Sequence, residues 1–443
     1  MTYRMIIFLL SVTVGVYGQG RMGLAMVAQN LKTGEQISEG NINQQYVPAS
    51  VLKVVTCAMA WDKLGEDFRY RSEIHVSGQV DANGIVQGDL IIQSSGDPTW
   101  DSRHLSKKGT VVRDIYDILC ERGIHGFSGD LMIETATGAT DHVSRYWLWE
   151  DLGNYYASGS WPINWRDNSI HIQFTRNQDN WDMVGSSADG IHNTWVNEVE
   201  LGPAGSGDQA YVFGSPYQDR RYIRGTLPRD RSKMTIKASM PNPVNTFAGH
   251  LIRYLNQNGI EIGTEVKVHL QSTRSNQKVT RVIGEIRSPE FDWIIRNALL
   301  HSDNLYVEAI AKRSFANASN YDEFLRSANA YLKEEWPEHG VILKDACGLS
   351  PLNRIAPLDL LSIWKDIIRS HPEFVELMPQ YEGVSLGRML NQQGVMKSGS
   401  MDGVLCYLGY DSNDWIYAVM YNGSESSSVI RKSMANFINS ISK

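Results

Sequence analysis

The sequence predicts an α/β protein of several domains. Its 443 residues suffice for about three domains of ordinary size. Helix and strand patterns follow one another near both ends of the chain, whereas the composition changes between about residue 100 and residue 285. In that middle part, seven of the twelve tryptophans fall between Trp100 and Trp195.

The overall composition is that of a globular protein, with 42% hydrophobic and 21% charged residues. A formal net charge of −7 argues against nucleic acid or an anionic membrane surface as the main partner. The four cysteines show no C-x-x-C spacing, and the eleven histidines include no H-E-x-x-H pattern. We therefore expect neither a metal site nor a cofactor.

The first 18 residues have the pattern of a cleaved signal peptide. Arg4 supplies the positive start, residues 5–16 form an apolar run, and Gly18 is the small residue before the expected cut. This run is too short to span a bilayer comfortably, and no later stretch is long enough. The expected product is an exported, periplasmic protein without an integral membrane segment in the mature chain.

The segment around Ser50 combines a helix start with a lysine on the same face. Residues 22–47 have the pattern of a β-hairpin, and Pro48 precedes an apolar helix over residues 51–64. Lys53 lies three residues after Ser50, so the two side chains are neighbours on the helix. A buried lysine at the positive end of a helix can accept the proton of a serine nucleophile. Ser-x-x-Lys also occurs at Ser362 and Lys365, so the spacing alone is weak evidence.

The middle of the chain predicts two similar α/β halves. Strands are expected at 70–77 and 86–94. A helix at 111–121 and another at 247–257 are each followed by Gly-Ile and then by a strand that begins with glycine. We interpret this as a two-part α/β domain split by a strand-rich segment at about 172–236. The alternative is that helix, glycine and strand simply follow one another often.

The last third returns to strong helical patterns. Helices are expected from residue 289 to 301, from Leu305 onward, at 322–336 and at 357–371. Three successive strands at 396–400, 404–410 and 415–421 are followed by an amphipathic helix fit to cover their sheet.

Two further motifs follow Ser50 in the order of the penicillin-recognising signature. Ser302-Asp303-Asn304 lies in a loop between helices, where Ser302 can relay a proton and Asn304 can hold a substrate amide. Lys397 stands on a predicted edge strand, where its charge attracts a substrate carboxylate and disfavours protonation of Lys53. Ser398 can form a hydrogen bond with that carboxylate, and Gly399 lets the substrate backbone lie close to the strand. The backbone N–H groups of Ser400 and Ser50 would form the oxyanion hole.

With these motifs in order, the chain resembles the penicillin-binding proteins, specifically the three-domain D-Ala-D-Ala carboxypeptidase/endopeptidase type of the penicillin-binding protein 4 family. The likeness extends to Gly88-Asp89-Leu90, Gly96-Asp97-Pro98 and residues 348–354. It implies a penicillin-binding/β-lactamase-like domain, with an antiparallel sheet flanked by helices, formed by residues 19–86 and 286–443. An α/β insertion would comprise 87–171 and 237–285, with a strand-rich domain at 172–236 nested within it.

The resemblance implies an exported serine D,D-peptidase that acts on peptidoglycan stem peptides and is acylated by β-lactam inhibitors. Ser50, Lys53 and Ser302 would be catalytic, and Asn304, Lys397, Ser398, Gly399 and Ser400 would bind substrate. The chain departs from the family at Ser398, where threonine is usual, and at Asp345-Ala346-Cys347-Gly348, where Asp-Gly-Ser-Gly is usual.

Three alternatives stay open at this point. The chain could be a wall-binding scaffold that keeps the fold without turnover, or a β-lactamase or esterase. A Gly-x-Ser-x-Gly pattern around Ser385 would suit an α/β-hydrolase, but the residues before it do not have the pattern of a strand.

Overall fold

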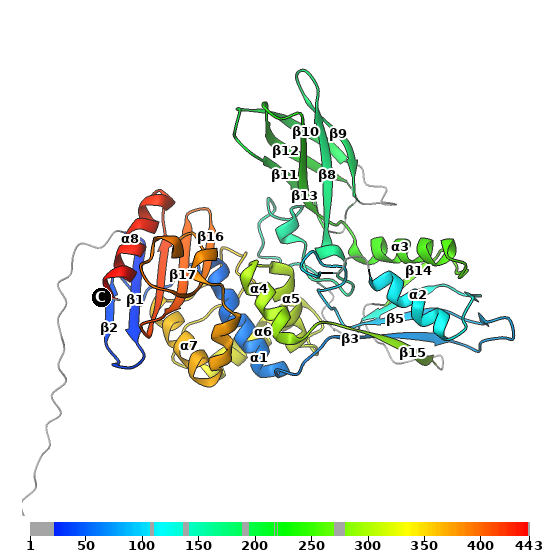
Figure 1. The fold of residues 1–443 in the computed structure, drawn as a ribbon, viewed down its shortest axis with the longest axis horizontal. Coiled ribbons are helices and arrows are strands. Elements are labelled where there is room, and N and C mark those ends of the chain that lie inside the picture. The colour runs from blue at the N-terminus through cyan, green and yellow to red at the C-terminus, as the bar shows by residue number, and fades with distance from the viewer. Residues whose placement is uncertain are drawn as a thin grey trace, which may run out of the picture.

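The computed structural model describes residues 22–441 except 107–109, 136–140, 188–194, 217, 219 and 270–279. The expected signal peptide, residues 1–18, lies outside the described residues. Within them, no helix has both the length and the apolar character needed to cross a membrane. Figure 1 shows one part in which helices pack beside a sheet, and two further parts with strands that project from it.

The first sheet joins the two ends of the chain. Its five antiparallel strands run in the order β16-β17-β18-β1-β2, and β1 pairs with β18 from Leu24↔Tyr421 to Asn30↔Trp415. The predicted hairpin and the three C-terminal strands are thereby confirmed, with β16 at an edge. The strands are β1 (Leu24–Asn30), β2 (Gln36–Glu39), β16 (Gly394–Met401), β17 (Val404–Asp411) and β18 (Trp415–Asn422).

Helices cover both faces of this sheet. The terminal helix α8 (Ser427–Ile441) packs on one face with its apolar stripe, as expected, and forms a core with alternate residues of β1, β17 and β18. The other face packs against a larger helical core. Its helices are α1 (Leu52–Leu64), α4 (Phe291–Leu300), α5 (Asn304–Ser314), α6 (Tyr321–Glu335) and α7 (Pro357–Ser370).

The second sheet has the order β14-β7-β5-β3-β15, and most of its strands lie in the expected insertion. Its two predicted halves meet directly, because β7 and β14 are parallel neighbours. One expected boundary is wrong: β3 (Arg71–Ser77) was assigned to the peptidase domain but pairs with β5 and β15. The other strands are β5 (Leu90–Ser94), β7 (Leu131–Thr135), β14 (Val266–His269) and β15 (Thr280–Arg287).

Two helices flank this second sheet, α2 (Val111–Glu121) and α3 (Pro243–Gln257). The second begins earlier than the expected residue 247. Pro243 has a backbone suited to the first helical position, and the side chain of Asn242 accepts a hydrogen bond from the N–H of Asn245. The small sheet of β4 (Ile85–Val86) and β6 (Gly126–Phe127) lies in the same part of the chain.

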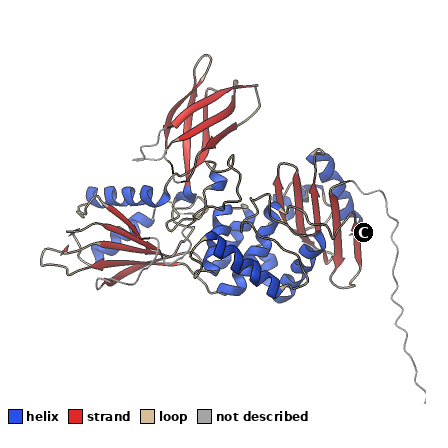
Figure 2. Cartoon of the chain, turned by 180° about the vertical axis from the view of Figure 1, so that it is seen from behind, coloured by secondary structure: helices blue, strands red, loops and turns tan. Residues whose placement is uncertain are grey.

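The strand-rich segment forms two three-stranded sheets, β13-β8-β9 and β10-β12-β11. Figure 2 shows them rising from the loops that lie between the other two parts. Their apolar side chains and those of the α/β part form one continuous core. The strands are β8 (Ser169–Arg176), β9 (Trp181–Ser186), β10 (Trp195–Gly202), β11 (Gln209–Phe213), β12 (Arg221–Pro228) and β13 (Lys233–Ser239).

A buried carboxylate after β5 makes stability depend on pH. Burial raises the pKa of Asp97 to about 6, although its Oδ1 accepts hydrogen bonds from the N–H and hydroxyl of Thr99. Its Oδ2 has no hydrogen-bond partner among the described residues. Because the unfolded pKa is about 3.9, the folded state binds more protons between about pH 4 and pH 6. The contribution of Asp97 to the free energy of unfolding therefore falls as pH rises through this window.

Asp97→Asn should remove this penalty. We expect urea unfolding to show a gain of about 1–3 kcal/mol at pH 7 and little change near pH 4. Asp81→Asn is the control of opposite sign, because hydrogen bonds from the N–H groups of Ile85 and Asn83 lower the pKa of Asp81. An equal effect of Asp97→Asn at both pH values would contradict the argument.

Candidate active site

Ser50 lies in a 3₁₀ turn, Ala49–Val51, that leads directly into α1. The expected position at a helix start is confirmed, although the first turn is 3₁₀ and not α-helical. Ala49 has a left-handed backbone with φ of 48°, so the chain turns sharply before the serine. Ser50 is partly exposed and lines a cleft, whereas Lys53 is fully buried beneath it.

The ammonium nitrogen of Lys53 has three oxygen partners. It lies 2.9 Å from Ser50 Oγ, 2.6 Å from Asn304 Oδ1 and 2.5 Å from the carbonyl oxygen of Cys347. All three oxygens lie within hydrogen-bond distance of this nitrogen, which can donate to each of them. The contacts thus suit a lysine that takes the proton of the serine.

The loop between α4 and α5 presents the second motif, as predicted. Asp303 accepts a hydrogen bond from the N–H of Tyr306 and caps α5, while Ser302 before it is left-handed with φ of 53°. Asn304 is held from the other side, because its Nδ2 donates to the carbonyl of Tyr156 at 2.8 Å. This contact, which the sequence analysis did not predict, fixes the amide so that its oxygen faces Lys53.

The third motif closes the cleft from β16. Lys397 Nζ lies 3.0 Å from Ser302 Oγ and 2.7 Å from the carbonyl oxygen of Ser398. Burial, and then the charge of Lys53, holds the pKa of Lys397 well below its usual range. The structure therefore brings Ser50, Lys53 and Asn304 into one hydrogen-bonded set and Ser302 and Lys397 into a second. Ser50, Ser302 and Asn304 line the same cleft.

Gly399 allows β16 to lie directly against the turn of Ser50. A Cβ atom at this position would lie 2.7 Å from the backbone nitrogen of Ser50 and 2.8 Å from the carbonyl oxygen of Pro48. No side chain fits there without moving the strand. Ser400 follows on the exposed rim and lines the same cleft as Ser50.

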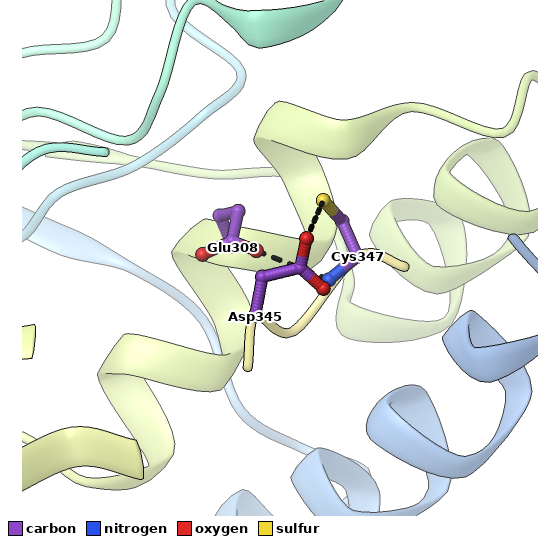
Figure 3. A group of neighbouring side chains, drawn as sticks. All are labelled: Glu308, Asp345 and Cys347. Atoms are coloured by element: carbon purple, nitrogen blue, oxygen red, sulfur yellow. Dashed lines mark hydrogen bonds between the residues drawn. The ribbon is translucent and has the colours of Figure 1, made fainter. Parts of the chain in front are cut away.

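The loop that carries the Cys347 carbonyl is held by two buried carboxylates, Glu308 and Asp345, to which the sequence analysis gave no role in the site. Glu308 accepts hydrogen bonds from the N–H groups of Ala346 at 2.9 Å and Cys347 at 3.0 Å. Burial raises the pKa of Glu308, and Asp345 beside it adds to the shift. Figure 3 shows Asp345 between Glu308 and the thiol of Cys347. A backbone carbonyl carries no residue-type signal, so only the departure from the family pattern at 345–348 pointed to this loop.

Ligand atoms of Glu308, Asp345 and Cys347 lie within 4.8 Å of one another. The carboxylate oxygens, however, already accept hydrogen bonds. Those of Asp345 accept N–H groups from Gly348, Ser350, Asn353 and Trp147. The second oxygen of Glu308 accepts the hydroxyl of Tyr321. The arrangement is that of a network that shapes the loop carrying the Cys347 carbonyl.

The cleft above Ser50 has a volume of ≈ 820 Å³. Its peptidase side carries Ser302, Asn304 and Ser400, and its opposite side is formed by the insertion. The sequence analysis did not predict the insertion side, although it noted how the tryptophans gather in that part of the chain. These insertion residues are Leu148, Glu150, Asp151, Tyr155, Tyr156, Tyr211 and Phe213.

The competing serine motifs lie elsewhere. Ser362 and Lys365 are on α7, where Lys365 Nζ donates to Gln29 Oε1 at 3.0 Å. Ser385 follows a 3₁₀ turn, Tyr381–Gly383, where the α/β-hydrolase motif requires a strand.

Residues 18–441 match the family model described as the D-Ala-D-Ala carboxypeptidase 3 (S13) family. The chain belongs to this family. The expectation of a serine-type D-Ala-D-Ala carboxypeptidase, a hydrolase among the bacterial cell-wall enzymes, is thereby confirmed.

A curated relative and two solved structures are similar to this chain over most of its length. The D-alanyl-D-alanine carboxypeptidase DacB of Haemophilus influenzae is 23% identical over 412 residues, which cover 88% of this chain and 82% of the relative. The crystal structure of penicillin-binding protein 4 from the same organism has a TM-score of 0.79 at 20% identity and covers 95% of this chain and 97% of that chain. Its complex with a β-lactam has a TM-score of 0.73 at 19% identity and covers 96% and 97%. The predicted fold class is confirmed by this likeness.

Proposed function

We propose that Ser50 attacks the carbonyl carbon of the penultimate D-Ala in a peptidoglycan stem peptide. The observation that carries this assignment is the position of Lys53 Nζ, 2.9 Å from Ser50 Oγ and bound to two further acceptors. Lys53 takes the hydroxyl proton as the bond between Ser50 Oγ and the carbonyl carbon forms. The negative charge on the carbonyl oxygen is stabilised by the N–H groups of Ser50 and Ser400.

Ser302 then relays the proton from Lys53 to the leaving amine, which returns Lys53 to its basic form. The intermediate then collapses, the peptide C–N bond breaks, and the terminal D-Ala leaves. The rest of the peptide stays bound to Ser50 as an acyl ester. Water hydrolyses this ester, and Lys53 acts again as the base. Lys397 donates to Ser302 Oγ at 3.0 Å, which orients the hydroxyl, and its charge attracts the terminal carboxylate of the substrate together with Ser398.

Endopeptidase action on cross-linked peptides requires only a larger leaving group, because the acyl half of the substrate is unchanged. The cleft of ≈ 820 Å³, with walls from two parts of the chain, supports such a substrate. We further propose that residues 1–18 direct the chain to the periplasm and that β-lactams acylate Ser50. We also propose that the inserted parts serve to form one wall of this cleft.

Purified peptidoglycan fragments test this function. Fragments with D-Ala-D-Ala ends and fragments with D,D cross-links are incubated with the chain and analysed by liquid chromatography and mass spectrometry. We expect release of D-Ala from the first and cleavage of the second. Binding without release would favour the scaffold, and hydrolysis of a chromogenic cephalosporin without release of D-Ala would favour a β-lactamase.

A further inference from the structure

A second pocket of ≈ 540 Å³ is lined by residues of β8, of β13 and of the loops before β8. Three basic side chains line it: Arg103, Arg166 and Lys237. The hydroxyl-bearing residues Ser169 and Ser187 line it as well. None of these residues takes part in the catalysis proposed above, and in a chain of net charge −7 such a concentration of cations stands out from the average surface.

Two aspartates in the pocket wall have their oxygens occupied from within. Asp101 accepts N–H groups from Thr110, Val111 and the indole of Trp165. Asp167 accepts the hydroxyl of Ser102 at 2.5 Å and the backbone N–H of Arg103 at 3.1 Å. Both carboxylates are buried, and their oxygens are already engaged by these donors.

Arg166 and Lys237 keep their charge available. Neither forms an ion pair with a described residue. Arg166 lies over the ring of Trp165 at 4.1 Å, and Lys237 lies 5.5 Å from the ring of Tyr155. Aromatic faces orient a cation without neutralising it. Arg103 differs, because its guanidinium is shared between Asp167 at 3.5 Å and Asp303 at 2.8 Å.

The backbone that presents Arg166 is unusual. Arg166, Asp167 and Asn168 are all left-handed, with φ of 52°, 57° and 48°. Such residues are costly outside glycine, so the surrounding structure must hold them in place. Asn168 contributes by accepting a hydrogen bond from the N–H of Trp165 at 3.0 Å and donating to the carbonyl of Gly159 at 3.1 Å.

The pocket adjoins the catalytic cleft at two places. Tyr155, the ring partner of Lys237, also lines the cleft. Arg103 lines the pocket and binds Asp303, which stands between Ser302 and Asn304. The two cavities are therefore linked by direct contacts between residues at their edges.

We propose that this pocket is a second subsite for peptidoglycan, in which Arg166 and Lys237 bind a carboxylate of a neighbouring stem peptide on the polymer held in the cleft. The inference rests on the proposed function, because that function makes peptidoglycan the substrate. Arginine and lysine suit this ligand, since a carboxylate accepts charge-assisted hydrogen bonds from both. Two linked sites raise the affinity for a polymer without affecting a short peptide.

The test compares polymer binding with the chemistry at Ser50. The full chain with Ser50→Ala is co-sedimented with peptidoglycan freed of attached phosphate-bearing polymers, with and without Arg166→Gln and Lys237→Gln together. We expect the dissociation constant to rise by about tenfold, the effect of losing charge-assisted hydrogen bonds. With Ser50 intact, the same pair of substitutions should leave acylation by benzylpenicillin unchanged.

Arg231→Gln with Lys233→Gln is the matched control, because it removes the same charge from exposed residues on or beside β13 that do not line the pocket. Equal loss of binding in both double variants, or none in the first, would overturn the subsite. A third outcome is that binding depends on Arg166 and Lys237 only while phosphate-bearing polymers remain attached to the peptidoglycan. That result would assign the pocket to phosphate and would also overturn the proposed subsite. Failure of the proposed function would show in a separate experiment, because the wild-type chain would then leave the D-Ala-D-Ala ends of peptidoglycan fragments intact.

Discussion

We expect Ser50→Ala to abolish both turnover and the covalent adduct with benzylpenicillin. The substitution removes one heavy atom, the Oγ that lies 2.9 Å from Lys53 Nζ. Without this oxygen no acyl-enzyme can form at residue 50. We expect the rate of D-Ala release to fall by roughly 10⁴-fold or more, as for other serine hydrolases that lose their nucleophile.

Intact mass after incubation with benzylpenicillin measures the adduct directly. The wild type should gain the mass of one antibiotic molecule and the variant none, with both remaining folded. Ser362→Ala is the matched control, because it alters the other Ser-x-x-Lys pair on α7. An adduct that persists in Ser50→Ala, or disappears in Ser362→Ala, would refute the assignment.

Asp345→Ala should cause the largest loss of stability. The carboxylate is fully buried and accepts hydrogen bonds from Gly348 N at 2.8 Å, Ser350 N at 2.5 Å, and the side chains of Asn353 and Trp147, each at 2.8 Å. Alanine leaves these donors in the interior without an acceptor. At about 1–3 kcal/mol for each unsatisfied group, and with partial relief by relaxation, we expect a loss of about 4 kcal/mol.

Urea unfolding measures this loss, and Asp359→Ala provides the comparison. Asp359 accepts hydrogen bonds from His339 and from the N–H of Gly340 but lies near the surface, so its removal should cost about 1 kcal/mol. Asp345→Ala should also slow acylation of Ser50, because the loop that carries the Cys347 carbonyl loses its support. Equal destabilisation by both substitutions would contradict the role of Asp345.

The parts of the site that could be predicted are those in which residue type and local pattern coincide. Ser50 and Lys53 lie on one helix start, and Lys397 lies on a strand whose edge position follows from the order of the last three strands. The Cys347 carbonyl, by contrast, contacts Lys53 across 294 residues and is part of the backbone. The contact between Asn304 and the carbonyl of Tyr156 is equally remote, at 148 residues.

The misassigned strand has the same explanation. β3 has the pattern of a strand, but its place depends on β15, which pairs with it from Ser77↔Thr280 to Arg71↔Arg287. No local feature identifies a partner so far along the chain. Periodicity therefore predicted that the strand exists and could not predict which sheet it joins.

The closure of the first sheet by the two ends of the chain affects the order in which the protein can be completed. Leu24 pairs with Tyr421, and the partners of Lys53 arrive 251 and 294 residues after it during synthesis. Contacts so distant in sequence form late, because their loops are long. A growing chain that lacks β18 therefore has neither a closed sheet beside α1 nor a finished cleft. The cleft is therefore complete only when the C-terminal strands have joined the sheet beside α1.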